Sequence, residues 1–95
     1  MNNQEKKPSN PKTIYNVAVL MDSQEQCNRM KQLCLDNGLP MSTHKDDYKF
    51  VNNPIQKNCF RFSKQLKCFA IWWLDCFNIL ITEAEFIELL KQEKG

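Results

Sequence analysis

Glycine and histidine are nearly absent from this chain, and their scarcity excludes several kinds of catalytic site. The two glycines are Gly38 and Gly95, so the chain cannot form a glycine-rich loop that cradles phosphate. The single histidine, His44, lies in a polar segment without a serine motif, which argues against serine–histidine and cysteine–histidine catalysis. Asp46 and Asp47 are adjacent, and neighbours on an extended chain point in different directions. The sequence therefore predicts a protein that is not an enzyme.

Long apolar runs are also missing. The longest, residues 68–74, is far shorter than the roughly 20 residues that span a membrane. Residues 1–12 are polar, include two prolines and lack the apolar segment and cleavage site of a signal peptide. We expect a disordered tail over 1–12, a single small domain over 13–95, and a cytoplasmic protein with no membrane partner.

Cysteine is more frequent, but its spacing does not indicate a metal site. The five cysteines form no C-x2-C pair of the kind that holds structural zinc. Their odd number, together with an N-terminus that carries no export signal, argues against a disulfide framework. We therefore expect free thiols that pack mostly as small apolar side chains, with no bound metal and no cofactor.

Two segments carry the pattern of amphipathic helices. The first, 23–37, begins at Asp22 or Ser23 with a capping-box spacing and ends at Gly38, which is followed by Leu39 and Pro40. The second, 83–93, starts with a capping box over residues 82–85, and its buried stripe is Phe86, Leu89 and Leu90.

Other segments carry the pattern of strands. Residues 13–21 end in a continuous apolar run, which is typical of a central strand. Residues 48–51 predict a short edge strand, and residues 77–81 predict another strand. Between them, residues 59–63 and 68–73 predict a hairpin with a tight turn near residues 64–65.

The hairpin has two different faces, because strand residues alternate. A pairing of Ser63 with Leu66 predicts a buried face and an open face. The buried face comprises Phe60, Phe62, Phe69, Ile71 and Trp73. The open face comprises Cys59, Arg61, Cys68, Ala70 and Trp72. The fold class that follows is α/β of the α+β type. It is a two-layer sandwich with a mostly antiparallel sheet of four to five strands and two helices on one face.

Charge is distributed unevenly along the chain, although the net charge is only +2. Residues 48–74 contain five cations and no acid, whereas residues 75–95 contain five acids and two lysines. A large aromatic side chain beside a cation is typical of a contact hot spot. The predicted partner-binding residues are Tyr48, Lys57, Arg61, Lys64, Lys67 and Trp72.

Three stretches together resemble small phage and mobile-element proteins. These are VAVLMDSQEQCNRMKQLCLDNGLPM, NCFRFS and ILITEAEFIELLK, which fall within residues 14–92. Members of this class with a known role tend to be binders: inhibitors of host defence, including CRISPR effectors, or sponges for signalling nucleotides. The resemblance implies a protein that is encoded by a phage or mobile element and occupies a host protein complex or signalling ligand. A phage-encoded protein of this kind would act in the host cytoplasm.

Three readings follow from these observations. The first is a non-enzymatic binding protein, for example of the anti-CRISPR type, whose partner is a host protein or protein complex and which can also form a homodimer. The second is a small regulator that binds nucleic acid or a nucleotide through a basic, aromatic sheet face. The third is a redox or metal protein built on the cysteines, which their spacing does not support. A salt titration separates the first two, because binding to phosphates weakens steeply with salt.

Overall fold

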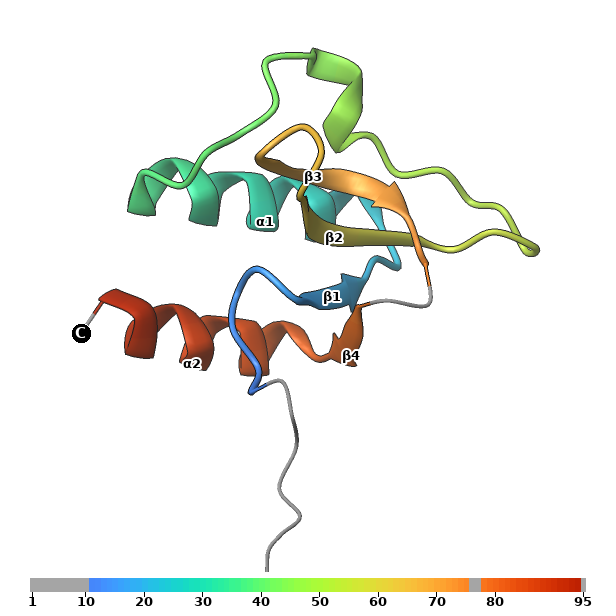
Figure 1. Cartoon of the computed structure of the whole chain (residues 1–95). Coiled ribbons are helices and arrows are strands. Elements are labelled where there is room, and N and C mark those ends of the chain that lie inside the picture. The colour runs from blue at the N-terminus through green and yellow to red at the C-terminus, as the bar shows by residue number, and fades with distance from the viewer. Residues whose placement is uncertain (1–10, 76–77, 95) are drawn as a thin grey trace, which may run out of the picture.

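The computed structural model describes residues 11–75 and 78–94, which form an α+β fold (Figure 1). Within them the chain has two α-helices, one 3-10 helix and a four-stranded sheet. The elements in chain order are β1 (Val17–Leu20), α1 (Gln24–Asn37), η2 (Lys45–Tyr48), β2 (Asn58–Ser63), β3 (Cys68–Trp73), β4 (Ile79–Ile81) and α2 (Glu83–Lys94).

The sheet has the strand order β3-β2-β1-β4, so the apolar strand β1 is central as expected. β2 pairs antiparallel with both β1 and β3, whereas β4 joins β1 in parallel. The sheet is therefore mixed rather than mostly antiparallel. The connection from β3 to β4 is the cause, because it joins two parallel strands at opposite edges of the sheet.

Helix α1 forms where its capping residues predict it. The Ser23 side chain accepts a hydrogen bond from the backbone N–H of Gln26, which satisfies one of the unpaired donors of the first turn. At the other end Gly38 has a φ of 65°, the left-handed conformation that glycine adopts without strain. The N–H groups of Gly38 and Leu39 donate to Leu35 and Cys34, which closes a Schellman motif.

Helix α2 begins with the predicted capping box. The backbone N–H of Glu85 donates to the Thr82 hydroxyl at 3.1 Å, and the Glu85 carboxylate accepts from the backbone N–H of Thr82 at 3.1 Å. This bond to the Thr82 backbone is also the main reason that the pKa of Glu85 is lowered. The reciprocal pair fixes the position at which the chain leaves β4 and enters α2.

Both helices pack on the same face of the sheet, which we call the helix face. Phe60 and Phe69 stack with ring centroids 5.4 Å apart, and Phe86 of α2 meets Phe60 edge-on at 5.3 Å. All three rings are at most 1% exposed. The same core includes three residues of α1, namely Cys27, Met30 and Cys34. The expected burial of this face is confirmed for Phe60, Phe69 and Ile71, and Phe62 is partly buried.

Trp73 departs from that expectation, because 42% of its surface is exposed. It lies at the last position of β3, opposite Asn58, where the strand pair ends. The alternation of side chains places Trp73 on the helix face as predicted. Its ring is nevertheless exposed, because it lies at the end of the strand.

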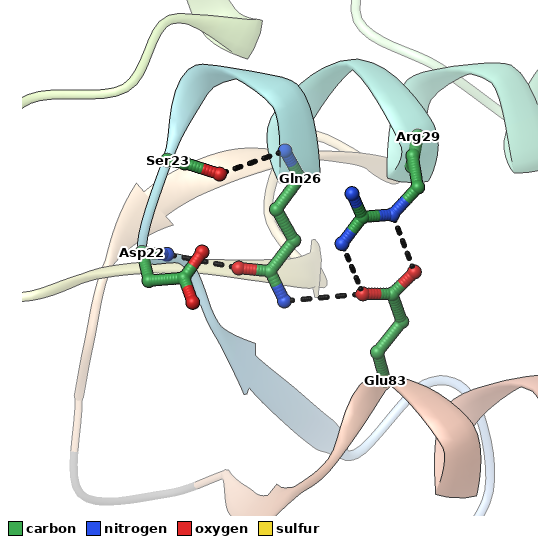
Figure 2. Close-up of polar contacts among 5 residues, drawn as sticks. All are labelled: Asp22, Ser23, Gln26, Arg29 and Glu83. Carbon is green, nitrogen blue, oxygen red and sulfur yellow. Dashed lines mark hydrogen bonds and ion pairs between the residues drawn. The ribbon is translucent and has the colours of Figure 1, made fainter.

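A polar cluster joins the N-terminal parts of the two helices, and Figure 2 shows its hydrogen bonds. The Arg29 guanidinium donates two bonds to the Glu83 carboxylate, at 3.1 and 3.0 Å. Gln26, which is only 8% exposed, donates to Glu83 and accepts from the backbone N–H of Asp22. The bond from Arg29 is the main reason that the pKa of Glu83 lies below its ordinary value. We call Gln26, Arg29 and Glu83 the helix clasp.

The predicted strand at residues 48–51 is wrong. The 3-10 helix η2 occupies Lys45–Tyr48, and residues 49–57 have no regular structure. Tyr48 is 4% exposed, and its hydroxyl donates to the carbonyl of Phe69 at 2.6 Å. The edge of β3 is instead contacted by Met41, through a single bridge to Phe69. Burial of one aromatic ring thus overrides the β-propensity of the segment.

The expected tail falls mainly on residues 1–10, which lie outside the described residues. Pro11 and Lys12 are described and make contacts: the Asn16 side chain donates to the Pro11 carbonyl, and the Lys12 ammonium lies 3.5 Å from Glu85. The first residue of the predicted strand 77–81 is also outside the described part, and β4 covers 79–81. No helix within the described residues is long and apolar enough to cross a membrane.

Candidate partner-binding surface

The β2–β3 hairpin is built as expected, with a longer turn. Residues 64–67 form the turn, and the Lys67 N–H donates to the Ser63 carbonyl at 2.7 Å. Ser63 therefore pairs with Cys68 rather than Leu66, and Arg61 pairs with Ala70. The shift from the predicted register is two residues, an even number, so every side chain remains on its predicted face.

The opposite face of the sheet, which we call the helix-free face, has small side chains at its centre. Ala18, Cys59 and Ala70 are all fully buried there. Beside them, the Arg61 guanidinium donates to the carbonyl of Trp73 and lies 3.4 Å from the Asp75 carboxylate. The connection from β3 to β4 therefore passes over this face at Asp75.

Trp72 and Arg61 belong to one interlocked group on this face. The Trp72 indole N–H donates to the Arg61 carbonyl at 2.9 Å, and its ring is partly buried against the core. The Arg61 side chain is only 19% exposed. Both residues lie on the predicted open face, but their polar groups already have partners within the chain. Their arrangement favours a structural role over direct contact with another molecule.

The turn end of the hairpin carries exposed lysines. Lys64 and Lys67 are exposed, and between them Leu66 is 62% exposed. Among the described residues, no carboxylate lies within ion-pair distance of either lysine. A hollow of about 410 Å³ adjoins this end, and Tyr15, Arg61 and Lys64 are among its lining residues.

The other end of the hairpin adjoins a loop that projects from the body of the protein, in yellow-green in Figure 1. Asn53 holds its tip, because its side-chain oxygen accepts from the N–H groups of Ile55 and Gln56. Ile55 is 89% exposed at that tip. The base is fixed by the buried Asn58 side chain, which accepts from the Val51 N–H at 2.6 Å.

Four exposed side chains lie on the projecting loop and at the strand end beside it, and together we call them the loop surface: Val51, Ile55, Lys57 and Trp73. Val51 and Trp73 are 44% and 42% exposed, and Lys57 is exposed. Lys57 and Trp73 are held close in space, because the Lys57 carbonyl accepts from the N–H of Leu74 at 2.9 Å. The loop surface is therefore apolar, carries a cation and rests on ordered backbone.

The structure does not gather the six predicted partner-binding residues in one place. Lys64 and Lys67 lie at the turn end, Lys57 lies at the opposite end, and Arg61 and Trp72 lie on the helix-free face. Tyr48 belongs to the core, where burial raises its pKa to about 12, and the Lys31 ammonium lies 5.3 Å from its ring centroid.

Three residues of the loop surface, Val51, Ile55 and Trp73, are not among the predicted partner-binding residues. A signal in the sequence could have indicated the exposure of Ile55, because this apolar residue directly follows the Asn53-Pro54 turn.

Three of the expected buried thiols are confirmed as buried. Cys27, Cys34 and Cys59 are fully buried, and burial raises their pKa values to about 11, 12 and 11. Cys68 is partly exposed, and Cys76 lies outside the described residues. Within the described residues, no group of three or more histidine, cysteine or acidic side chains is arranged to hold a metal ion.

Comparison of the chain with models of known protein families, with curated proteins and with solved structures found no match.

Proposed function

We propose that this chain is a non-enzymatic protein-binding protein that occupies a host protein or protein complex through the loop surface. The observation that carries the proposal is Ile55, an aliphatic side chain 89% exposed at the tip of an ordered loop. When the backbone beneath an exposed apolar group is already held by hydrogen bonds, binding does not have to order that backbone. The burial of the group then contributes more to affinity than it would on a flexible loop.

Charge defines the kind of partner that fits. Lys57 belongs to the loop surface, and residues 48–74 contain no acid. A partner with an apolar pocket bordered by carboxylates would match both the shape and the sign of this surface. In the setting that the phage resemblance suggests, such a partner is a component of a host defence system.

The test is capture from a bacterial lysate with four versions of the tagged full chain. These are the wild type, Ile55→Asp, Trp73→Ala and the control Leu35→Asp. Leu35 is also an exposed aliphatic side chain, at 56%, but it lies on α1 outside the loop surface. A partner retained by the wild type and Leu35→Asp but lost with Ile55→Asp and Trp73→Ala supports the proposal.

The captured partner is then purified for measurement of Kd. Loss of a hot-spot contact of about 2 kcal/mol corresponds to about a thirtyfold weaker Kd for Ile55→Asp. Equal capture by Ile55→Asp, or equal loss with Leu35→Asp, contradicts the proposal. Because the contact is mainly apolar and includes one cation, its affinity should fall much less with salt than binding to phosphates does.

A second candidate function, binding of a nucleotide or single-stranded nucleic acid, is favoured by the hollow at the turn end. There the Tyr15 ring is 36% exposed, and Lys64 supplies a cation beside it. Stacking on an aromatic ring and attraction of phosphate are the two elements of such sites. Binding of a labelled oligonucleotide that weakens steeply with salt and is lost in Lys64→Glu but not in Lys57→Glu would support it. Absence of binding at low salt would exclude it.

A further inference from the structure

A second hollow, of about 470 Å³, lies at the corner of the sheet opposite the hairpin turn. It sits at the ends of β1 and β4, beside the starts of both helices. Val19, Leu20, Leu80 and Ile81 supply apolar walls, and Glu83 and Glu85 lie at its rim. Leu20 and Leu80 are 41% and 51% exposed, so apolar surface is open to solvent there. We call this the acidic corner.

Charge around this corner is negative. Four acids lie there: Asp22 and Glu25 at the start of α1, and Glu83 and Glu85 at the start of α2. Two cations pair with them, Arg29 with Glu83 and Lys12 with Glu85. An occupant that combines an apolar side chain with flanking cations is therefore complementary to the corner in both respects.

The chain itself carries such a segment, which is the turn Lys64-Gln65-Leu66-Lys67. Leu66 is 62% exposed, and a lysine stands on each side of it within two residues. Lys67 has a φ of 60°, and bonds from Leu66 and Lys67 to Ser63 hold the turn in one conformation. The turn is thus an ordered tip whose apolar and charged groups match the acidic corner.

We propose that the hairpin turn of one molecule docks into the acidic corner of a second copy. A molecule cannot fill its own corner, because the turn follows Ser63 at one end of β2 while Leu20 pairs with Cys59 near the other end. In addition, the turn adjoins the edge strand β3, and the corner adjoins the opposite edge strand β4. Contacts between two different surfaces produce chains or rings when they repeat head to tail, and they close a two-fold dimer when each molecule docks its turn in the corner of the other.

The experiment is sedimentation velocity of the full chain from micromolar to millimolar concentration, at low and high salt, with a reductant to protect the exposed thiol. The variants are Leu66→Glu, which alters the turn, and Leu80→Lys, which alters the corner. Leu35→Glu is the matched control, because Leu35 is exposed on α1 and belongs to neither surface. All three replace exposed leucines, and thermal unfolding checks that each variant is folded.

We expect the wild type and the control to form dimers or larger species as concentration rises, and to dissociate in part at high salt. Each of the other two variants alone should remain monomeric. An equimolar mixture of them should form dimers and nothing larger, because one retains an intact corner and the other an intact turn. A monomeric wild type, association of either variant to wild-type extent, or a mixture that remains monomeric would overturn the proposal.

Discussion

The two faces of the sheet are covered to different extents and by different means. On the helix face, two helices cover large rings, and Phe60, Phe69 and Phe86 contact one another directly. On the helix-free face, side chains of the sheet and its connections lie beside small buried residues, and hydrogen bonds fix Trp72 and Arg61. A small domain can thus bury the centre of the second face of a sheet without a third layer of secondary structure.

This difference predicts that the largest loss of stability follows from substitution of a buried ring on the helix face. Phe86→Ala should reduce the free energy of unfolding by about 3 to 5 kcal/mol, because it removes a buried ring and leaves a cavity between α2 and the sheet. Denaturant unfolding measures the change. Glu88→Ala, an exposed change on the same helix, is the control and should remain within about 0.5 kcal/mol of the wild type. A loss below about 1 kcal/mol for Phe86→Ala would show that α2 does not pack as described.

The next largest effect should distinguish the two adjacent tryptophans. Trp72→Ala should cost about 2 kcal/mol, because the ring is partly buried and its hydrogen bond to Arg61 is lost. Trp73→Ala should cost less than about 1 kcal/mol, because the ring is 42% exposed at the end of its strand. Equilibrium unfolding of both variants gives the comparison. The opposite order would mean that the helix-free face does not depend on Trp72.

Asn58→Ala should have a smaller effect, of about 1 to 2 kcal/mol, because it leaves the Val51 N–H without its buried acceptor. The change should also release the base of the projecting loop. Hydrogen exchange at the Val51 amide should therefore accelerate. The rate of exchange at the Ile55 amide should not change, because its hydrogen bond to Asn53 remains. Unchanged exchange at Val51 would contradict the role of Asn58 as the anchor of the loop.

The smallest effect should come from the helix clasp, and it should depend on pH. The pKa of Glu83 is lowered in the folded state, so its stabilisation is present above the ordinary value of 4.5 and is lost as the pH falls through the folded value. Glu83→Gln should cost about 1 kcal/mol or less at neutral pH, and the difference from the wild type should shrink in acid. Glu88→Gln is the control, because its ion pair with Lys91 is exposed. A difference that does not vary with pH would exclude the clasp as its source.

Local signals in the sequence were sufficient for much of this fold. Both helices begin at capping residues, Ser23 and Thr82, and α1 ends at Gly38; the effect of each extends over one turn. The alternation of the hairpin assigned its faces correctly, because the even change in register preserved them. These features depend on residues that are close together in the chain.

The features that the sequence did not predict depend on contacts between distant segments. Burial of Tyr48 against β3 decides the conformation of residues 45–51, and the parallel addition of β4 depends on how the chain returns across the sheet. Arg29 and Glu83 are more than fifty residues apart in the chain, so no local pattern indicates their pairing. The exposure of Trp73 and the partners of Arg61 likewise follow from where each strand ends.

The strand order has a consequence for the way in which the protein is made. β1 is synthesised first, but its two partners in the sheet, β2 and β4, come from the second half of the chain. Until those residues leave the ribosome, the apolar segment VAVLM has no strand beside it, whereas the β2–β3 hairpin closes as soon as it emerges. A nascent chain that has not yet released β2 therefore exposes β1 as an unpaired, aggregation-prone strand, and β4 is needed to pair its second edge.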